Sequence, residues 1–466
     1  MNRTDTIVAP ATASGGALGI IRMSGPQALA IGDRLFRSAT RKKLSDAAGH
    51  TLLYGEIIDP DTGSAIDDVL VSVFRASHSY TGENSIEISH HGSRYIQSEI
   101  LRSAIRCGAR SAEAGEFTVR AFLAGKLDLS QAEAVADMIA STDRGTHALA
   151  LNQMRGGYSR ELGTLRDELV TLMSLLELEL DFSEEEVEFA DRSQLHRIMT
   201  QTNDKILGLI RSFSLGNAIK EGVNVAIVGN PNAGKSTLLN TLLNEERAMV
   251  SDIAGTTRDT IEETLVIGGI RFRLSDTAGI RRSDDRLERM GIERTFAAIG
   301  RARIVILLID ASLFDLQQTL GAIASLDLQQ EQRLCLLLNK IDKLAPEAIS
   351  AIRQTLASAT SCDRILAVSA KHNRNIDLLT DFLHDCIDAA PAYNGETVVS
   401  NIRHYEALQR AHEALRRALD SLACGTTADL LAEDIRDVLY HLGTITGEIT
   451  NDEILGQIFS KFCIGK

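Results

Sequence analysis

The chain has 466 residues, of which 44% are hydrophobic and 24% charged, and its formal net charge is −14. This length suggests about three domains with buried cores, and the absence of long uninterrupted apolar runs argues against a membrane-spanning helix. The negative charge repels phosphate backbones and argues against broad, non-specific binding of nucleic acid. Six scattered cysteines without a Cys-x-x-Cys pair, and no predicted signal peptide, favour reduced thiols and a cytoplasmic location.

Residues 1–123 are predicted to form a mixed α/β region. Runs 17–22, 69–74 and 85–89 carry β-branched or alternating apolar residues, which predict strands, and apolar spacing predicts a helix over 96–105. The basic run Arg41-Lys42-Lys43 is a candidate RNA contact, although a solvated loop is the more usual role of such a short run.

Residues 124–219 are predicted to be helical. Ser130 and Glu133 form a capping-box pattern. Leucines then recur every three or four positions and mark one face of a long helix, namely Leu162, Leu165, Leu169, Leu172, Leu176 and Leu180. An acidic run over 184–191 could bind a divalent cation, but a solvated helix start is the more usual role.

Residues 220–383 alternate strand and helix, which is the pattern of a doubly wound α/β domain. Strands are predicted over 223–228, 304–310, 334–338 and 365–369, and the runs 262–267 and 270–275 predict a hairpin around Gly268-Gly269. Residues 384–466 return to helices. Because each flanking helical segment lacks partners for its apolar face, we expect one helical domain interrupted by the α/β domain, with two separate bundles as the alternative.

A phosphate loop follows the first strand of this α/β domain, since residues 229–236 spell Gly-Asn-Pro-Asn-Ala-Gly-Lys-Ser. Its backbone N–H groups and the following helix are expected to bind phosphates. Lys235 is expected on the β- and γ-phosphates, and Ser236 as a ligand of Mg²⁺. The expected nucleotide contacts of the loop are Asn232, Ala233, Gly234, Lys235, Ser236 and Thr237.

Four further boxes follow in the order of a guanine-nucleotide site. The sequence 255–259 offers Thr257 as a mobile Mg²⁺ ligand. The box Asp276-Thr277-Ala278-Gly279 offers a carboxylate on the metal side and an N–H group for the γ-phosphate. Asp342 of Asn339-Lys340-Ile341-Asp342 would accept two hydrogen bonds from guanine and so select GTP over ATP. Ser369-Ala370-Lys371 would close over the guanine O6. Together the boxes resemble the Ras-like superfamily of guanine-nucleotide-binding proteins.

Ile280 stands where Ras-like GTPases usually carry a water-positioning glutamine. An isoleucine cannot orient a water molecule, so either hydrolysis is negligible or another group does this. Asp284, Asp285 and Glu288 lie just downstream and could reach back, or they could be an ordinary acidic helix start.

Motifs outside the α/β domain resemble one family along the whole chain. They are Asp5-Thr6-Ile7-Val8-Ala9, Gly19-Ile20-Ile21-Arg22-Met23-Ser24-Gly25, Tyr80-Thr81-Gly82-Glu83, Gly115-Glu116-Phe117-Thr118, Arg120-Ala121-Phe122-Leu123, Lys126-Leu127-Asp128-Leu129 and Phe462-Cys463-Ile464-Gly465-Lys466. The chain resembles the tRNA modification GTPase family MnmE, also called TrmE. The resemblance implies a mixed α/β, folate-binding and dimerisation domain at 1–123. It also implies an all-α helical domain in two halves, 124–219 and 384–466, with a Ras-like, doubly wound G domain inserted at 220–383.

The resemblance also implies a K⁺-activated GTPase that acts with the FAD-dependent protein MnmG. Together they would install an aminomethyl or carboxymethylaminomethyl group at C5 of the wobble uridine in tRNA. The one-carbon unit would come from a tetrahydrofolate derivative, in the 5-formyl or 5,10-methylene form. The implied partners are a second copy in a homodimer, MnmG in a heterotetramer or larger assembly, and tRNA mainly through MnmG, with no membrane.

Catalytic residues and the K⁺ site also follow from the resemblance, because G domains of the family meet face to face during hydrolysis. The implied K⁺ ligands are the Asn232 side chain and the carbonyls of Ser251, Ile253 and Thr256, of which Ser251 and Thr256 also count as nucleotide contacts. Glu288 matches the catalytic glutamate, which positions the attacking water indirectly, and Lys235 and Thr257 complete the catalytic set. The alternative source of positive charge is Arg258, as an arginine finger in cis.

Folate contacts carry over to Arg22, Glu87, Lys126 and Lys466. The basic groups suit an acidic ligand and Glu87 suits pterin donors, although without the family each would be an ordinary surface charge. Since Lys466 ends the sequence, the C-terminal segment is expected to fold back to the N-terminal domain. Cys463 matches a terminal cysteine of the family, with modification chemistry, packing and redox sensitivity all open as its role.

Two other functions remain open. One is a regulatory or ribosome-assembly GTPase switch without folate chemistry, against which the N-terminal motifs argue. The other is a folate-dependent transferase with a vestigial G domain, against which the intact nucleotide boxes argue.

Overall fold

The computed structural model describes residues 5–181, 192–246, 262–276, 298–329, 332–386, 397–450, 452–459, 462 and 465. The chain forms two compact units. The first comprises Met1–Ala140, Ala150–Asn203 and Arg410–Lys466, and the second comprises Ser141–Leu149 and Asp204–Gln409.

The first unit begins with a seven-stranded sheet of order β3-β4-β5-β6-β2-β1-β7, in which only the β1–β7 pairing is parallel. Its strands are β1 (Ile7–Pro10), β2 (Leu18–Ser24), β3 (Phe36–Ser38), β4 (Thr51–Ile58), β5 (Ala65–Phe74), β6 (Ser85–His91) and β7 (Arg110–Ser111). Helices α1 (Ala28–Leu35) and α2 (Arg94–Arg106) complete the mixed α/β region. The predicted strands and the helix over 96–105 are confirmed, with β5 beginning four residues earlier than predicted, at Ala65.

One face of this sheet forms a hydrophobic core with α1 and α2. Val69, Val71 and Val73 alternate along β5 with more exposed residues, and all three are buried in that core. Because side chains alternate between the two faces of a strand, the residues between them lie on the other face. Arg22 of β2 and Glu87 of β6 lie on that other face as register partners.

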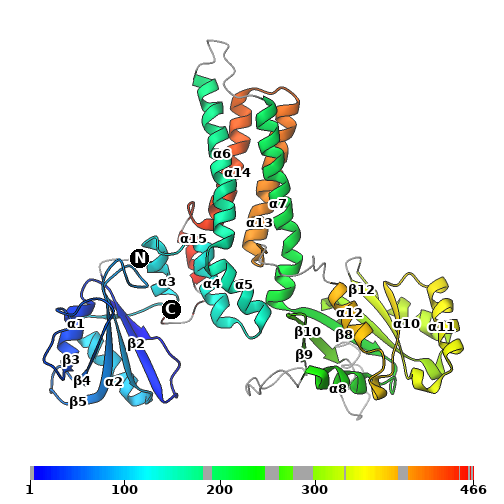
Figure 1. Cartoon of the computed structure of the whole chain (residues 1–466), viewed down its shortest axis with the longest axis horizontal. Helices are drawn as coiled ribbons and strands as arrows, with labels where there is room; N and C mark the ends of the chain where they lie inside the picture. Colours follow the sequence, from blue (N-terminus) through cyan, green and yellow to red (C-terminus); the bar gives the residue numbers. More distant parts are fainter. Residues whose placement is uncertain are drawn as a thin grey trace. The chain divides into compact units, whose positions relative to one another are not determined.

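Helices lie before and after the α/β segment along the chain (Figure 1). They are α3 (Glu116–Leu123), α4 (Leu129–Ala140), α5 (Arg144–Met154), α6 (Gly157–Asp181), α7 (Arg192–Glu221), α13 (Ile402–Ala423), α14 (Ala428–Thr446) and α15 (Asp452–Phe459). The predicted leucine face of α6 is buried from Leu162 to Leu176, and α14 packs along α6. Arg436 pairs with Glu177 at 2.9 Å. The expectation of one interrupted helical domain is therefore confirmed over two separate bundles.

The start of α4 corrects one prediction. Asp128, not Ser130, caps this helix: Oδ1 of Asp128 accepts from the N–H of Gln131 at 2.8 Å, and Oε1 of Gln131 accepts from the N–H of Asp128 at 3.0 Å. Ser130 is buried inside the helix, where its oxygens accept from Gln153. The prediction was wrong by two residues because Asp-x-x-Gln makes the same reciprocal cap as Ser-x-x-Glu.

The second unit holds a six-stranded sheet of order β13-β12-β11-β8-β10-β9. Its strands are β8 (Val223–Gly229), β9 (Glu262–Ile267), β10 (Ile270–Asp276), β11 (Ile304–Asp310), β12 (Arg333–Asn339) and β13 (Arg364–Ala367). Its helices are α8 (Lys235–Glu246), α10 (Leu316–Ser325), α11 (Pro346–Ala359) and α12 (Asp377–Asp385), with short 3₁₀ turns η2 (Ala311–Leu313), η3 (Ile341–Lys343) and η4 (Ala370–His372). All pairings are parallel except the predicted β9–β10 hairpin.

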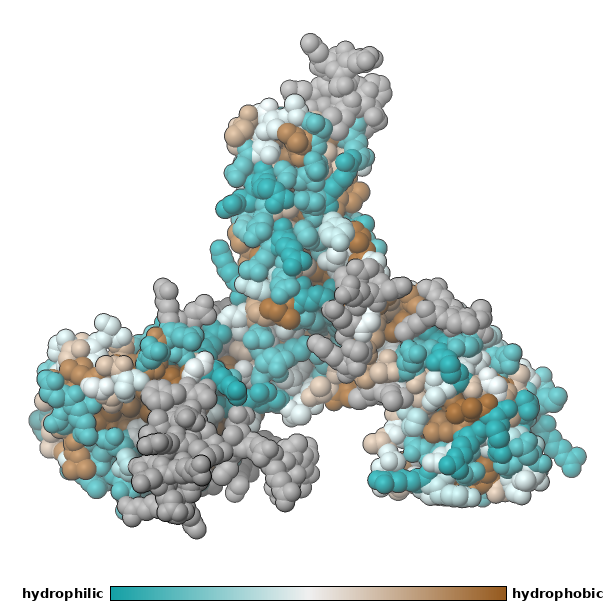
Figure 2. Space-filling view, turned by 180° about the vertical axis from the view of Figure 1, so that it is seen from behind, coloured by the Kyte–Doolittle hydropathy of each residue, from teal (hydrophilic) through white to brown (hydrophobic). Residues whose placement is uncertain are grey.

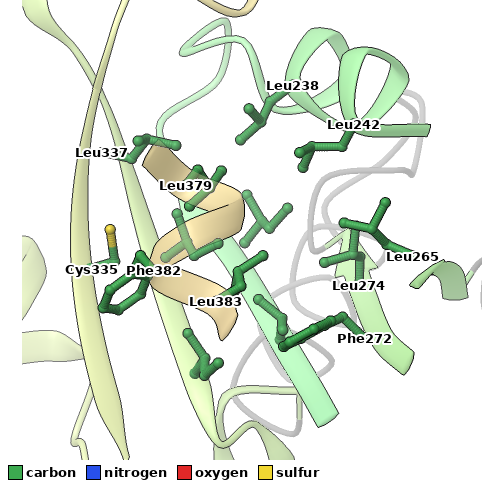
Figure 3. Packing of buried hydrophobic residues seen from close by; sticks show 14 of the residues in the cluster. Leu238, Leu242, Leu265, Phe272, Leu274, Cys335, Leu337, Leu379, Phe382 and Leu383 are labelled. Atoms are coloured by element: carbon green, nitrogen blue, oxygen red, sulfur yellow. The ribbon is translucent and has the colours of Figure 1, made fainter. Parts of the chain in front are cut away.

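Helices cover both faces of this sheet. On one face, leucines of α8 and α12 pack with Phe272 of β10 and Leu337 of β12, as Figure 3 shows. On the other face, Leu326 and Leu356 pack over Val305 and Leu336. Continuous apolar runs such as 304–308, buried on both faces, are typical of parallel strands. The predicted doubly wound, Ras-like α/β fold is thereby confirmed, with the loop after β8 at the centre of the sheet.

No helix among the described residues is long and apolar enough to cross a membrane. Hydrophilic residues predominate on the face that Figure 2 shows, with hydrophobic residues in small groups. The cysteines at 107, 335, 362, 386 and 424, within the described part of the chain, carry free thiols.

Candidate functional site

The loop between β8 and α8 turns sharply at two positions. Asn232 has φ +64° and Gly234 has φ +104°, both in the left-handed region. A Cβ at Gly234 would clash with Nδ2 of Asn339. Glycine is therefore required at 234 by both conformation and space.

Lys235 begins α8 and is almost completely buried. Its ammonium group donates to the carbonyl groups of Gly229 and Asn230, the latter at 3.2 Å, and so lies inside the curve of the loop. Ser236 and Thr237 are exposed on the first turn of α8. A helix N-terminus with a lysine inside the preceding loop is suited to bind phosphate groups.

Asn339, the last residue of β12, joins this loop to two other predicted boxes. Its side chain is buried, donates from Nδ2 to the carbonyl of Ala233 at 2.8 Å, and accepts at Oδ1 from the N–H of Ala370 at 3.0 Å. The carbonyl of Ala370 in turn accepts from the hydroxyl of Thr241 on α8 at 2.8 Å. The loop, the Asn-Lys-x-Asp box and the Ser-Ala-Lys box therefore form one hydrogen-bonded unit.

Lys340 connects the Asn-Lys-x-Asp box to the neighbouring loop residue Asn232 and to Asp310. Its ammonium group donates to the carbonyl of Asn232 at 2.6 Å and to Oδ2 of Asp310 at 2.7 Å. The pKa of Asp310 lies below its ordinary value: burial would raise it, but the hydrogen bonds from Lys340 and Ser312 outweigh that effect. Sequence reasoning missed Asp310, although its place at the end of an apolar parallel strand was a usable signal.

Asp342 is hydrogen-bonded to the first residue of the predicted Ser-Ala-Lys box. Its Oδ1 accepts from the hydroxyl of Ser369 at 2.6 Å, and Nε2 of His372 lies 3.8 Å from its Oδ2. The hydrogen bond from Ser369, with smaller effects from His372 and Lys343, holds the pKa of Asp342 below its ordinary value. Asp342 therefore carries an ionised carboxylate at neutral pH, which can accept hydrogen bonds.

A cavity of about 260 Å³ lies on the β11 side of the loop. It is lined by loop residues Asn230 and Pro231 and by two aspartates, Asp310 at the end of β11 and Asp315 at the start of α10. Asp315 caps α10, because its Oδ1 accepts from the N–H of Gln318 at 2.8 Å.

Several predicted site residues lie outside the described part of the chain. These are Ser251, Ile253, Thr256, Thr257, Arg258, Thr277, Ala278, Gly279, Ile280, Asp284, Asp285, Glu288, Cys463 and Lys466. The acidic run over 184–191 also lies outside it. The backbone of Asp276 is described: it ends β10 opposite Ile227 of β8, the strand that precedes the phosphate loop.

In the first unit, Arg22 and Glu87 form an ion pair, with Nε and Nη2 of Arg22 both 2.8 Å from Oε1 of Glu87. The Arg22 guanidinium lies over the rings of Tyr80 and Phe117, at 5.4 and 5.7 Å from their centroids. Lys126 donates to the carbonyl of Ser77, in the loop that carries Tyr80. The structure thus brings Arg22 and Glu87 together and places Lys126 on the neighbouring loop. The contact of the two aromatic rings with Arg22 was not predicted.

A charge network lies next to this region. Arg120, 6% exposed, contacts the carboxylates of Asp5 at 2.6 Å, Glu116 at 2.9 Å and Glu83 at 3.2 Å. Arg110 pairs with Glu116 at 2.6 Å and with Asp5 at 2.7 Å. Burial would raise the pKa values of Asp5 and Glu116, but hydrogen bonds, chiefly from the arginines, hold both below their ordinary values.

The C-terminal segment packs on the N-terminal part of the first unit. Phe459 and Phe462 are buried together, with ring centroids 5.1 Å apart, and lie close to Gly115. Gly465 has φ +100° and lies so close to the carbonyl of Pro10 that no Cβ would fit. The segment does fold back, as the sequence predicted.

Comparison with known proteins decides the family. A family model described as the MnmE helical domain matches residues 129–463, and one described as the GTP-binding protein TrmE N-terminus matches residues 6–126. The tRNA modification GTPase MnmE of Flavobacterium johnsoniae is 49% identical over 470 residues, covering 100% of both chains. The chain belongs to the MnmE family.

Other MnmE relatives agree with this assignment. The tRNA modification GTPase MnmE of Bacteroides fragilis is 49% identical over 464 residues, covering 99% of both chains. Among solved structures, Era of Aquifex aeolicus is 26% identical, covers 41% of this chain and 65% of that chain, and has a TM-score of 0.29, too low to bear on the assignment. The resemblance to MnmE found in the sequence is thus confirmed, while the domain bounds at 123, 219 and 383 and the roles of individual site residues stay predictions.

Proposed function

We propose that this MnmE-family protein hydrolyses GTP as part of tRNA modification. The observation that carries the proposal is the joined site, in which Asn339 and Lys340 hold the consecutive loop carbonyls of Ala233 and Asn232. A box for the base and a loop for phosphates are thereby connected directly. The names of the relatives, tRNA modification GTPases at 49% identity over the full chain, support the same function.

In this function each described residue has a distinct role. Lys235 moves from its loop carbonyls to the β- and γ-phosphates, and the N–H groups at the start of α8 bind phosphate oxygens. Asp342 accepts hydrogen bonds from guanine, while Ser369 keeps its carboxylate oriented. Ser236 is exposed on the first turn of α8, where its hydroxyl fits a ligand of Mg²⁺. When bound, Mg²⁺ supplies positive charge at the phosphates.

For the hydrolytic step we assign Glu288 to orient the attacking water and Thr257 to complete the Mg²⁺ site. Asn232, exposed at the apex of the loop with its left-handed backbone, is assigned as a K⁺ ligand together with Ser251, Ile253 and Thr256. When bound, K⁺ supplies further positive charge for the developing negative charge of the transition state. Pairing of two G domains in a homodimer completes this arrangement.

The first unit is assigned to the tetrahydrofolate derivative that provides the one-carbon unit. Arg22, which lies near the rings of Tyr80 and Phe117 and pairs with Glu87, offers a fixed cation beside the exposed ring of Tyr80, which suits an acidic aromatic ligand. Lys126 and Lys466 are assigned to the same ligand. The FAD-dependent partner MnmG and tRNA complete the modification at C5 of the wobble uridine.

GTP turnover by the purified protein in KCl and in NaCl at equal ionic strength tests the GTPase part. We expect K⁺-specific turnover whose rate per molecule rises with protein concentration, because paired G domains hydrolyse faster. Equal turnover in both salts would remove the K⁺ site and make Arg258 the leading source of positive charge. No turnover in either salt would refute the proposed GTPase activity.

Binding of 5-formyltetrahydrofolate tests the folate part separately. We expect calorimetric binding by the wild-type protein and its loss in Arg22→Met, with GTP turnover unchanged. Absence of binding by the wild type would favour a GTPase switch without folate chemistry.

A further inference from the structure

The ammonium group of Lys340 lies between acceptors from two different segments of the second unit. It is 2.6 Å from the carbonyl oxygen of Asn232 and 2.7 Å from Oδ2 of Asp310. The Lys340 side chain is 26% exposed and that of Asp310 14%, so the pair is partly shielded from water. A charge-assisted hydrogen bond is stronger in such surroundings than on an open surface.

Asp310 belongs to none of the five nucleotide boxes. It ends β11, which lies between β8 and β12, the two strands that lead into the phosphate loop and the Asn-Lys-x-Asp box. Its Oδ1 accepts from the N–H of Ser312 at 3.0 Å and from the Ser312 hydroxyl at 2.6 Å. These bonds fix the carboxylate from one side, so that its other oxygen faces Lys340.

We propose that Asp310 is a positioning residue for the bound nucleotide, because its carboxylate holds Lys340 against the phosphate loop at Asn232. This inference rests on the proposed function, since it assumes that guanine nucleotides bind at this loop. Asn339 anchors the carbonyl of Ala233 directly, whereas the carbonyl of Asn232 depends on a long, flexible lysine. The carboxylate of Asp310 removes that flexibility.

Loss of the negative charge leaves the Lys340 ammonium with only neutral acceptors at these two positions. The lysine then gains conformational freedom, and the strained turn at Asn232, with φ +64°, loses one anchor. The phosphate-binding N–H groups of the loop are held less firmly before the nucleotide arrives. The effect is independent of the base, because Asp342 and Ser369 are untouched.

Asp310→Asn in the full chain tests this proposal, because it keeps the shape and removes the charge. We expect roughly five- to tenfold weaker binding of GDP, the difference between a charge-assisted and a neutral hydrogen bond. Inosine diphosphate, which lacks the exocyclic amine of guanine, should lose the same factor. Calorimetric titration measures both affinities, and kcat at saturating GTP should stay within about twofold while KM rises.

Two control variants separate the loss of the Lys340–Asp310 ion pair from general effects of a substitution near the cavity. Asp315→Asn makes the same chemical change at another helix-capping aspartate that lines the same cavity. Ser312→Ala removes the hydroxyl donor to Oδ1 of Asp310, but the N–H of residue 312 still donates to that oxygen, so the ion pair of Asp310 with Lys340 is kept. Both should bind GDP within about twofold of the wild type, because neither removes the Asp310 carboxylate or the Lys340 ammonium group. Asp310→Asn combined with Lys340→Met should cost no more than Lys340→Met alone.

Two results would overturn the role proposed for Asp310, and a third would refute the proposed function itself. GDP affinity of Asp310→Asn at the wild-type level would overturn it. Equal losses in Asp310→Asn and Ser312→Ala would also overturn it, because the effect would then belong to the turn η2 rather than to Lys340. A wild-type protein that binds no GDP would refute the proposed function itself, which the titration of the wild type shows first.

Discussion

Two adjacent residues of one box hold two adjacent carbonyl groups of the phosphate loop. Asn339 binds the carbonyl of Ala233 and Lys340 that of Asn232. The motif pattern in the sequence was enough to find both residues, because the residue types and order of the box already indicate a guanine-nucleotide site. It could not show that Asp310 contacts Lys340 or that two rings lie near Arg22, because those contacts join segments far apart in the chain. For Asp310, its place at the end of an apolar strand was the usable signal.

The carboxylate of Asp342 has its own prediction. Asp342→Asn should weaken GDP binding by at least about a hundredfold and shift preference toward xanthosine diphosphate, because an amide presents a donor to the guanine N–H groups. Competition titrations with GDP, ADP and xanthosine diphosphate measure the change. Asp363→Asn, at an aspartate that pairs with Arg333, is the control. Unchanged discrimination in Asp342→Asn would contradict the assignment of this residue to the base.

At the scale of the element, the apolar periodicity predicted strands and helices well because buried faces impose it. Strand β11 has the predicted bounds, and the leucine face of α6 is buried from Leu162 to Leu176. The cap of α4 was misplaced because two overlapping patterns, Asp128–Gln131 and Ser130–Glu133, both fit a helix start. Only the hydrogen bonds of Asp128 separate them.

The corrected cap is directly testable. Asp128→Ala should lower the free energy of unfolding by about 1 kcal/mol, the usual contribution of a capping side chain. Asp128→Asn should restore most of it, since asparagine caps equally well. Thermal unfolding followed by circular dichroism measures both. A melting temperature of Asp128→Asn as low as that of Asp128→Ala would mean that charge, not capping, is what matters at this position.

The loop between β8 and α8 gives a prediction of a different kind. Gly234→Ala should abolish most GDP binding, because a Cβ would displace Asn339, which is 2% exposed and bonded on both sides. Gly321→Ala on α10, where a Cβ meets nothing within 4 Å, should leave binding intact. That control should also stabilise the helix by up to about 1 kcal/mol. Wild-type GDP affinity in Gly234→Ala would contradict the described fit of the loop against Asn339.

At the scale of the whole molecule, the sequence predicted the order of fold types along the chain, including the inserted G domain. The reason is physical: helices on each side of the insertion had apolar faces without local partners. Helix α14 packs along α6, and ion pairs at 2.7 and 2.9 Å link α6 to Glu448 just after α14 and to Arg436 within it. The charge network of the first unit could not be predicted, since it joins residues from four separate motifs.

The ion pairs of Arg110 and Arg120 with Asp5, Glu83 and Glu116 predict how the stability of the first unit depends on pH. The pKa values of Asp5 and Glu116 are lowered by folding, so their stabilising effect is present above the ordinary carboxyl pKa and is lost as pH falls through the lowered values. Arg120→Met leaves three carboxylates without this cation and should cost about 3 kcal/mol at pH 7. In that variant the carboxyl pKa values rise, so the cost relative to the wild type should shrink at pH 5.

Unfolding by urea at pH 7 and pH 5 measures both values. Arg102→Met, at a surface arginine with a 72% exposed side chain, is the control and should change stability by less than about 0.5 kcal/mol. A cost for Arg120→Met that stays constant between the two pH values would show that packing, not charge, explains its effect.

The packing of Phe459, Phe462 and Gly465 against Gly115 and Pro10 has a consequence for how the protein is made. The N-terminal sheet emerges from the ribosome long before the C-terminal segment, which packs against Pro10 and Gly115, is synthesised. Until then, the cluster that includes Val119 and Leu129 lacks two of its aromatic members. The first unit therefore cannot reach its final state during early translation, and its last folding step waits for residues at the far end of the sequence.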